Sequence, residues 1–241
     1  GANGDDDAYR NRSLSLNLSH SFNDSLQVGF NALDQRGQVE YDDTFTGSLP
    51  TTDFLLSSIS GFIDARVTEV WNSRLELGHS EDKRDSGNDQ AGGTVSQFNT
   101  YRDAANWLNT LTLNENHQLL LGLDWYEDRA QGTTDFVEDS RWNRAAFFQH
   151  RYIGEAFSTE LGVRHDDNQQ FGHENTWNAA LTLPLNNAND LILSYSEGFR
   201  APTFNDLYYP DFCFGGMCFP SANPDLAPER SKSYELQWRS R

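Results

Sequence analysis

The sequence predicts an all-β protein: an antiparallel up-and-down sheet that forms part of a transmembrane β-barrel. Apolar residues recur at every second position, polar residues stand between them, and short links alternate with long ones. A period of two is typical of a strand with one apolar face, whereas an amphipathic helix spaces its apolar residues three and four positions apart. A sheet that turns an apolar face to lipid and a polar face to a wet interior has this pattern.

Eleven strands are expected, and many of them are long. A tilted strand needs about nine to eleven residues to cross a bilayer, whereas strands of soluble proteins average about five or six residues. The strands expected from the sequence span residues 9–22, 25–41, 57–67, 71–85, 96–113, 117–130, 140–152, 155–167, 174–185, 190–200 and 230–240.

Each strand follows from a local alternation of apolar and polar residues. In the first strand, serines and an asparagine stand between leucines, and in the fourth strand Arg74, Glu76 and Gly78 form the polar face. The apolar residues that alternate in the first, second and ninth strands are Leu14, Leu16, Leu18, Leu26, Val28, Phe30, Trp177, Ala179, Leu181, Leu183 and Leu185.

The links between the strands sort into two kinds. The tight turns are built from residues that tolerate turn conformations, and they are Asn23-Asp24, 68–70, 114–116, Ile153-Gly154 and 186–189. The longer, polar links are 42–56, 86–95, 131–139, 168–173 and 201–229. Strict alternation places the short turns at one end of the sheet and the long loops at the other. Outer-membrane barrels have this asymmetry.

A soluble sandwich or β-solenoid gives the same alternation, but it does not explain the long strands or the sorted links. An odd number of strands with two unpaired edges does not close as a single-chain bacterial barrel, which usually has an even count, and an open edge in lipid leaves backbone groups unsatisfied at several kcal/mol each. The first residue is Gly1, and the last strand reaches almost to the final residue. We therefore expect residues 1–241 to be a slice of a longer protein.

Composition narrows the choice of partners. The chain has 36 Asp and Glu against 18 Lys and Arg, a formal net charge of −18, so nucleic acid is not expected as a partner. The mean hydropathy is −0.71 and no stretch is apolar enough for a spanning helix, which leaves an alternating barrel as the membrane form.

Catalysis is not expected. The six histidines have no paired nucleophile motif, and no Gly-x-Ser-x-Gly, His-Glu-x-x-His or glycine-rich phosphate loop occurs. Asp166-Asp167 reads as a pair of solvated residues at a loop edge. A barrel hydrolase with Ser and His in its wall is the alternative.

The two cysteines, Cys213 and Cys218, lie five residues apart in a segment rich in Gly, Pro and Phe. That separation suits a disulfide across a tight loop, which indicates an oxidising compartment such as the periplasm or cell surface. The alternatives are two free thiols or half of a metal site.

Acidic residues gather where the sheet brings its first loops together. Asp5, Asp6 and Asp7 precede the first strand, Tyr41-Asp42-Asp43 ends the second, and Asp53 lies in the link that follows. Carboxylates in that number suit Ca²⁺, which takes six to eight oxygen ligands. The alternative is a solvated acidic loop; an EF-hand is excluded because Ala8 stands where its glycine is needed.

The most specific stretch is the tenth strand with the loop after it. Glu197-Gly-Phe-Arg-Ala-Pro202 closes the strand, and Asn223-Pro-Asp-Leu-Ala-Pro-Glu229 opens the next. In order and separation these runs resemble the TonB-dependent outer-membrane receptors. Gly122-Leu-Asp-Trp125, and Asp166-Asp-Asn-Gln-Gln-Phe-Gly172 followed by Thr176-Trp177, resemble the middle strands of that family's vitamin B12 receptors.

This resemblance implies a fold and a function. It implies about 11 strands of a 22-stranded barrel in the Gram-negative outer membrane, surrounded by lipid, with the plug domain that engages TonB absent. It implies active uptake of cobalamin or another corrinoid. A siderophore or haem receptor of the same architecture is one alternative, and a passive porin or surface adhesin is another.

The resemblance also implies site residues. A calcium ion that orders the outer loops would be held by Asp5, Asp7, Tyr41, Asp42 and Asp53. The loop from Tyr208 to Ala222 is longer than in the family's cobalamin receptors and contains the two cysteines. Its aromatic residues Tyr208, Tyr209 and Phe212 are candidates for the substrate surface.

Overall fold

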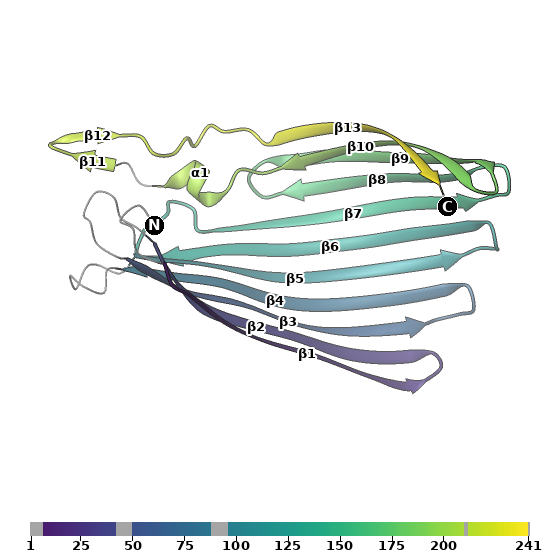
Figure 1. The fold of residues 1–241 in the computed structure, drawn as a ribbon, viewed down its shortest axis with the longest axis horizontal. Coiled ribbons are helices and arrows are strands. Elements are labelled where there is room, and N and C mark those ends of the chain that lie inside the picture. The colour runs from purple at the N-terminus through teal and green to yellow at the C-terminus, as the bar shows by residue number, and fades with distance from the viewer. Residues whose placement is uncertain (1–6, 42–49, 88–95, 210–211, 241) are drawn as a thin grey trace.

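The computed structural model of the protein describes residues 7–41, 50–87, 96–209 and 212–240 (Figure 1). Thirteen strands and one short helix make up this part of the chain. The long strands are β1 (Tyr9–Asn23), β2 (Leu26–Glu40), β3 (Thr51–Arg66), β4 (Trp71–Gly87), β5 (Ser96–Thr112), β6 (His117–Gly132), β7 (Ser140–Ile153), β8 (Ser158–Asn168), β9 (Gly172–Asn186), β10 (Asn189–Arg200) and β13 (Glu229–Ser240). Between β10 and β13 lie helix α1 (Phe204–Tyr208) and the short strands β11 (Phe212–Phe214) and β12 (Met217–Phe219).

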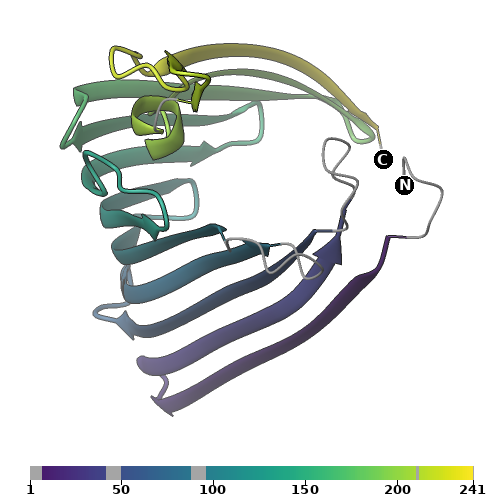
Figure 2. The ribbon, with the colours of Figure 1, turned by 90° about the vertical axis from the view of Figure 1, so that its left-hand side faces the viewer.

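The long strands form one antiparallel sheet of 11 strands, in which β1 to β10 follow chain order and β13 pairs with β10. The turns that join β1 to β2, β3 to β4, β5 to β6, β7 to β8 and β9 to β10 lie together at one end of this sheet, and the other links, of which only the one between β8 and β9 is short, lie at the other end (Figure 1). Seen along the strands, the sheet curves like part of a barrel wall (Figure 2). The all-β, up-and-down barrel segment predicted from the sequence is therefore confirmed.

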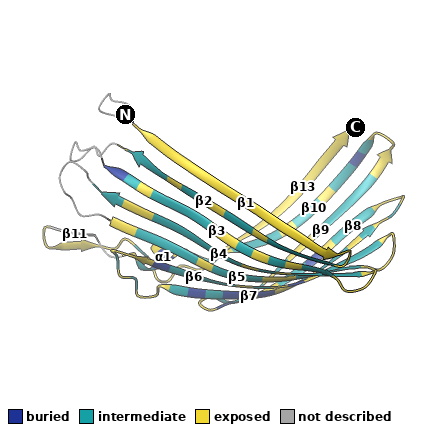
Figure 3. Cartoon of the chain, turned by 90° about the horizontal axis from the view of Figure 1, so that it is seen from below, coloured by how far each residue is buried: buried dark blue, intermediate teal, exposed yellow. Residues whose placement is uncertain are grey.

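The two faces of the sheet differ in chemistry. The cross-strand register places Leu77, Trp107 and Leu123 on the outer, convex face, where they are 57%, 45% and 50% exposed. Exposed positions recur among partly buried ones along β2 to β10, whereas the edge strands β1 and β13 are exposed throughout (Figure 3). An apolar band that faces outward without protein cover is what a lipid-facing wall requires.

The apolar band ends before the strands do. Towards the loop end, the outer face carries ion pairs in place of leucines, such as Lys83 with Glu81 at 2.7 Å and Arg144 with Asp167 at 2.6 Å. Charged side chains are costly within the hydrocarbon region, so these pairs mark the level at which the wall rises above it. The strands therefore extend beyond the apolar band on the loop side.

The few buried apolar residues do not form a core within the sheet. Among the described residues, the buried hydrophobic side chains are Ala130, Ala145, Phe204 and Leu207, and the last two belong to α1. The sheet itself therefore contributes only two alanines to the buried apolar side chains of the described residues. No helix in the described ranges is long and apolar enough to cross a membrane.

Three predicted boundaries are wrong. β3 begins at Thr51 and not at residue 57, because Thr51 and Thr52 continue the ladders with β2 and β4. The link between β8 and β9 is a tight turn of residues 169–171 and not a long loop, since the Asn168 side chain accepts hydrogen bonds from the N–H groups of Gln170 and Phe171. β8 begins at Ser158, because residues 154–157 form the preceding turn.

Candidate functional site

Helix α1 lies inside the curve of the sheet, near its loop end (Figure 2). A capping box starts this helix: the Thr203 hydroxyl accepts a hydrogen bond from the Asp206 N–H at 3.2 Å, and the Asp206 carboxylate accepts one from the Thr203 N–H at 2.9 Å. Pro202 immediately before the cap favours an extended residue at the approach to the helix. The sequence therefore fixes where the loop turns inward.

The buried arginine Arg141 on β7 holds this loop against the wall. Its Nη1 donates to the Pro202 carbonyl at 3.0 Å and to the Gln170 side chain at 3.1 Å. The guanidinium also lies over the rings of Phe204, at 5.1 Å, and Phe171, at 5.5 Å. Cation–π contacts of this kind are worth about 0.5–2 kcal/mol each, more when the site is desolvated. Arg141 therefore connects three separate segments.

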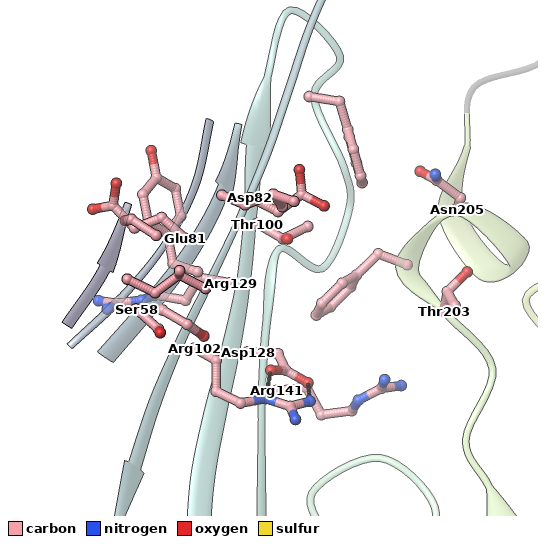
Figure 4. Close-up of a pocket in the computed structure, with 17 residues that line it drawn as sticks. Ser58, Glu81, Asp82, Thr100, Arg102, Asp128, Arg129, Arg141, Thr203 and Asn205 are labelled. Carbon is pink, nitrogen blue, oxygen red and sulfur yellow. Dashed lines mark hydrogen bonds and ion pairs between the residues drawn. The ribbon is translucent and has the colours of Figure 1, made fainter. Parts of the chain in front are cut away.

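A cavity of about 540 Å³ lies between α1 and the inner wall. Figure 4 shows Asp82, Thr100 and Arg102 on the side of the strands and Thr203 and Asn205 across from them on the α1 side. The other inward-facing lining residues are Leu33, Leu56, Ser58, Ser80, Phe98, Asp128, Arg141 and Phe204. We call this space the α1 cavity.

Cross-strand ion pairs fill the inner wall beside the α1 cavity. Arg102 on β5 is bound by both oxygens of Asp128 on β6, at 2.6 and 2.8 Å. Such bidentate pairs hold the guanidinium in a fixed orientation. The charge of Arg102 is therefore balanced within the wall itself.

A second network lies on β6, β7 and β8. Arg164 donates to Asp124 at 2.5 Å and to both oxygens of Asp166, at 2.9 and 3.1 Å. Asp166 is 3% exposed and also accepts a hydrogen bond from Asn143 at 2.9 Å. This carboxylate is therefore a buried structural group and not the solvated loop residue that the sequence suggested.

The α1 cavity is suited to binding. It combines aromatic rings, hydroxyls and an amide with arginines whose contacts are already made, which is a lining that orients a bulky solute. No group of three or more His, Cys, Asp or Glu in the described ranges could hold a metal ion.

The three aromatic candidates for the substrate surface, Tyr208, Tyr209 and Phe212, lie in different parts of the loop. Tyr208 is the last residue of α1, and its hydroxyl accepts a hydrogen bond from Gln170 on the β8–β9 turn. Tyr209 follows it and is 48% exposed. Phe212 lies in β11, and its side chain is outside the described part of the structure. Neither Tyr208 nor Tyr209 lines the α1 cavity; the loop contributes Thr203, Phe204 and Asn205 to it.

The two cysteines lie opposite one another in the β11–β12 hairpin, and Cys218 is disulfide-bonded. The hairpin turns through Gly215 and Gly216, which have φ of 61° and 82°. Two consecutive positive φ values are what a two-residue hairpin turn needs, and glycine adopts them without strain. This register supports the Cys213–Cys218 disulfide, which stays a prediction for the protein in solution.

The predicted calcium ligands are only partly within the described residues. Asp5 and Asp42 lie outside them. Asp7 and Tyr41 lie at one corner of the sheet, since their neighbours Ala8 and Glu40 are joined by a backbone hydrogen bond of 2.9 Å. The calcium site itself stays a prediction.

Asp53 does not lie in the loop, as the sequence suggested, but within β3. Its register partners are Gln38 and Asp85, and its Oδ1 accepts a hydrogen bond from Gln38 Nε2 at 3.0 Å. Because Pro50 is the residue that pairs with Tyr41, Asp53 lies three residues further along β3 from that corner. The Asp53 carboxylate would have to give up its hydrogen bond from Gln38 to bind a cation at the corner of Asp7 and Tyr41.

The cap of α1 contains a titratable group with a shifted pKa, Asp206. Hydrogen bonds from the backbone N–H and hydroxyl of Thr203 lower the pKa of Asp206 below 3.8 because they stabilise its carboxylate. The helix cap is therefore anionic at neutral pH.

The sequence did not identify the residues that line the α1 cavity. Arg102, Asp128 and Arg141 stand on different strands, so their contacts depend on register, which composition and alternation do not supply. A local signal did exist for α1, because Thr203 followed three residues later by Asp206 fits the pattern of a helix start.

The curved sheet, the outward apolar band and the inward loop define a class of protein. Residues 1–240 match the family described as TonB dependent receptor-like, beta-barrel, and the chain belongs to that family. It is 30% identical over 96% of its length to the vitamin B12 transporter BtuB of Photobacterium profundum, and 31% identical over 98% to that of Vibrio vulnificus. It spans 36% and 38% of these two relatives.

Solved structures of siderophore receptors share the fold. The ferric enterobactin receptor PfeA of Pseudomonas aeruginosa superposes with a TM-score of 0.79 at 15% identity, and the siderophore receptor PirA of Acinetobacter baumannii with 0.74 at 17%. Each comparison covers 98% of this chain and 41% of the other. At such identities the likeness establishes the architecture alone.

Proposed function

We propose that the protein of which this wall is part is an outer-membrane receptor that takes up cobalamin actively, with energy delivered through TonB. The observation that carries this proposal is sequence identity of 30–31% to vitamin B12 transporters over nearly the whole chain. The siderophore receptors resemble it in fold at 15–17% identity. A Gram-negative outer membrane is the location that follows.

The chemistry of the α1 cavity supports a corrinoid over a ferric siderophore. Many ferric siderophores are anions, and a site for them needs positive charge that is not already neutralised. Here Arg102, which lines the cavity, is bound by both oxygens of Asp128. A corrinoid is a bulky ring with amide side arms, which hydroxyls, amides and aromatic rings can hold.

The second candidate is a siderophore receptor. It is favoured by one observation: Arg141 lines the cavity and makes its hydrogen bonds to a carbonyl and an amide, with no carboxylate bonded to it among the described residues. An anionic chelate could approach that charge. The identity to vitamin B12 transporters makes this reading the weaker one.

Uptake by cells tests the proposed function. The full-length receptor is produced in a strain that lacks its own cobalamin receptor, with TonB present or deleted, and uptake of labelled cyanocobalamin is followed. Accumulation above the receptor-free strain that disappears without TonB is expected. Equal uptake in both strains would indicate a passive pore, and no uptake in either would remove cobalamin as the substrate.

Calcium that orders the outer loops is a separate part of the proposal. Asp7 and Tyr41 at one corner support it, and Asp5, Asp42 and Asp53 are its remaining proposed ligands. Chelation of calcium is expected to lower the cobalamin affinity of the full-length receptor, and Asp42→Ala to abolish that dependence. Asp139→Ala, which removes an acidic residue just before β7, serves as the control. Affinity that is unchanged by chelator contradicts the site.

A further inference from the structure

The α1 cavity opens into two different hollows of the inner wall. A hollow of about 330 Å³ shares Leu33, Ser58, Ser80 and Arg102 with it, and lies deeper along β1 to β5. Another, of about 570 Å³, shares Arg102, Asp128, Arg141 and Thr203 with it, and extends sideways over β6 to β10. We call them the neutral hollow and the charged hollow.

The neutral hollow leads away from the loop end. β3 runs from the loops to the turns, and the cavity above is lined by Leu56 and Ser58 whereas the hollow is lined by Ser58 and Ser60. β4 runs the other way, and the lining steps from Asp82 and Ser80 to Ser80 and Gly78. Both strands therefore show the lining descending by one inward-facing position.

The lining of the neutral hollow is small and uncharged. Its inward-facing members include Ser15, Asn17, Asn31, Ser60 and Gly78, and the one charged residue among the inward-facing members, Arg102 at its border, is held by Asp128. His79 also lines the hollow, but the register places it on the outer face, bonded to Asp103. Hydroxyls and amides exchange hydrogen bonds with a passing solute at low cost, because each new bond replaces one that was made to water. Such a surface binds a solute weakly at many places and does not hold it at any one of them.

The charged hollow has the opposite character. Arg164 is bonded to Asp124 and to Asp166, and Asp166 also to Asn143, so cross-strand bonds stiffen the wall there. A solute that displaced those bonds would leave charged groups in the wall without partners, which is strongly unfavourable. The wall of the charged hollow is therefore expected to keep its conformation when a solute is present.

From this contrast we propose that the neutral hollow on β1 to β5 is the wall along which the bound solute leaves the α1 cavity towards the periplasm. The solute is the bulky, amide-bearing substrate of the proposed function, on which this inference rests. The charged hollow is the fixed side of the lumen. Passage therefore follows one side of the barrel and not its whole interior.

A matched pair of glycines tests the route. Gly78 lines the neutral hollow, and a Cβ built there meets no atom of the described residues closer than 3.6 Å, so the wall accepts a side chain at this position. Gly198 lines the charged hollow, and a Cβ there lies 3.2 Å from the Ser231 hydroxyl. Gly78→Trp and Gly198→Trp therefore add the same bulk to the two sides.

In the full-length receptor, Gly78→Trp is expected to lower the rate of cyanocobalamin uptake at least tenfold while equilibrium binding changes less than twofold. Gly198→Trp is expected to leave uptake within twofold of the parent. Ser60→Trp, at a second position in the neutral hollow, is expected to repeat the effect of Gly78→Trp and guards against a folding defect at one site.

Three results would overturn the inference: normal uptake by both neutral-hollow variants, equal loss in Gly198→Trp, or a rise in passive permeability to large antibiotics. The last would show that the neutral hollow seats a plug. Failure of the proposed function looks different, since the parent receptor itself would then neither bind nor take up cyanocobalamin.

Discussion

Single residues decide how the outer loop closes over the wall. Arg141 is 8% exposed, yet its partners are a carbonyl, an amide and two rings. These contacts come from the β8–β9 turn and from the segment that begins α1. The position of α1 over the cavity therefore depends strongly on this one side chain.

Replacement of Arg141 is the first prediction. Arg141→Ala removes two hydrogen bonds and two ring contacts, so cobalamin affinity of the full-length receptor is expected to fall about tenfold, or about 1.4 kcal/mol. Protease cleavage within 201–209 is expected to become faster. Arg151→Ala, an exposed inward-facing arginine near the turn end of β7, is the control and leaves both measurements unchanged. Equal effects of the two substitutions would contradict the role of Arg141.

The helix cap gives a prediction about pH. The pKa of Asp206 is lowered in the folded protein, so its stabilisation of α1 is complete above the unfolded value, near 3.8. It is lost as pH falls through the lower, folded value. Cleavage of residues 201–209 by pepsin, relative to an unstructured peptide, is expected to accelerate below about pH 4. Asp206→Asn removes this acceleration; an unchanged pH profile in that variant would show that another group is responsible.

At the scale of strands and turns, the sequence predicted the parts of the wall that touch lipid. Where alternate residues must be apolar, as in Leu75 and Leu77 of β4, the pattern specifies a strand. Above the membrane that constraint ends. Thr51, Thr52 and Asp53 therefore read as loop, although they continue β3 through backbone pairing and a 2.7 Å hydrogen bond of Thr52 with Ser86.

The inner wall was less predictable than the outer. The Arg102–Asp128 pair is formed by residues 26 positions apart that meet only in the register of β5 and β6. The β11–β12 hairpin was missed although Gly215-Gly216 between short apolar runs is a hairpin signal. Its strands of three residues are shorter than an alternation can identify.

Cross-strand pairs of glycine and phenylalanine give an element-level prediction. Gly122 on β6 is the register partner of Phe147 on β7, and a Cβ at Gly122 would fall within the Phe147 ring. Gly122→Ala is expected to destabilise the receptor by about 1–3 kcal/mol in denaturant unfolding, because the ring must move. Gly61→Ala, where a Cβ meets nothing closer than 3.8 Å, is the control.

The test of this pairing is a rescue. Phe147→Ala removes the ring, so adding Gly122→Ala to it is expected to cost less than 0.5 kcal/mol. An equal cost of Gly122→Ala in both backgrounds would locate the strain elsewhere.

The hairpin disulfide is the second prediction at this scale. Denatured full-length receptor is expected to show no labelling of Cys213 or Cys218 by maleimide until a reductant is added. The register that places the two cysteines opposite one another is the reason. Labelling without reductant would show that the bridge does not form.

At the scale of the whole molecule, the curved sheet divides its surroundings. Its convex face is apolar and its concave face is polar, and the loop after β10 folds into the concave side through α1. That division explains why family membership follows from the wall alone. Substrate identity requires the cavity, because siderophore receptors share the wall at 15–17% identity.

Direct equilibrium binding to the full-length receptor is the measurement that tests the central claim most directly. Cyanocobalamin and ferric enterobactin are titrated separately in detergent with calcium present, and each is then used to compete with the other. The proposed function predicts saturable binding of cyanocobalamin at least a hundredfold tighter than that of the siderophore, with no competition by the siderophore. Tighter binding of ferric enterobactin, or binding of neither ligand, would contradict it.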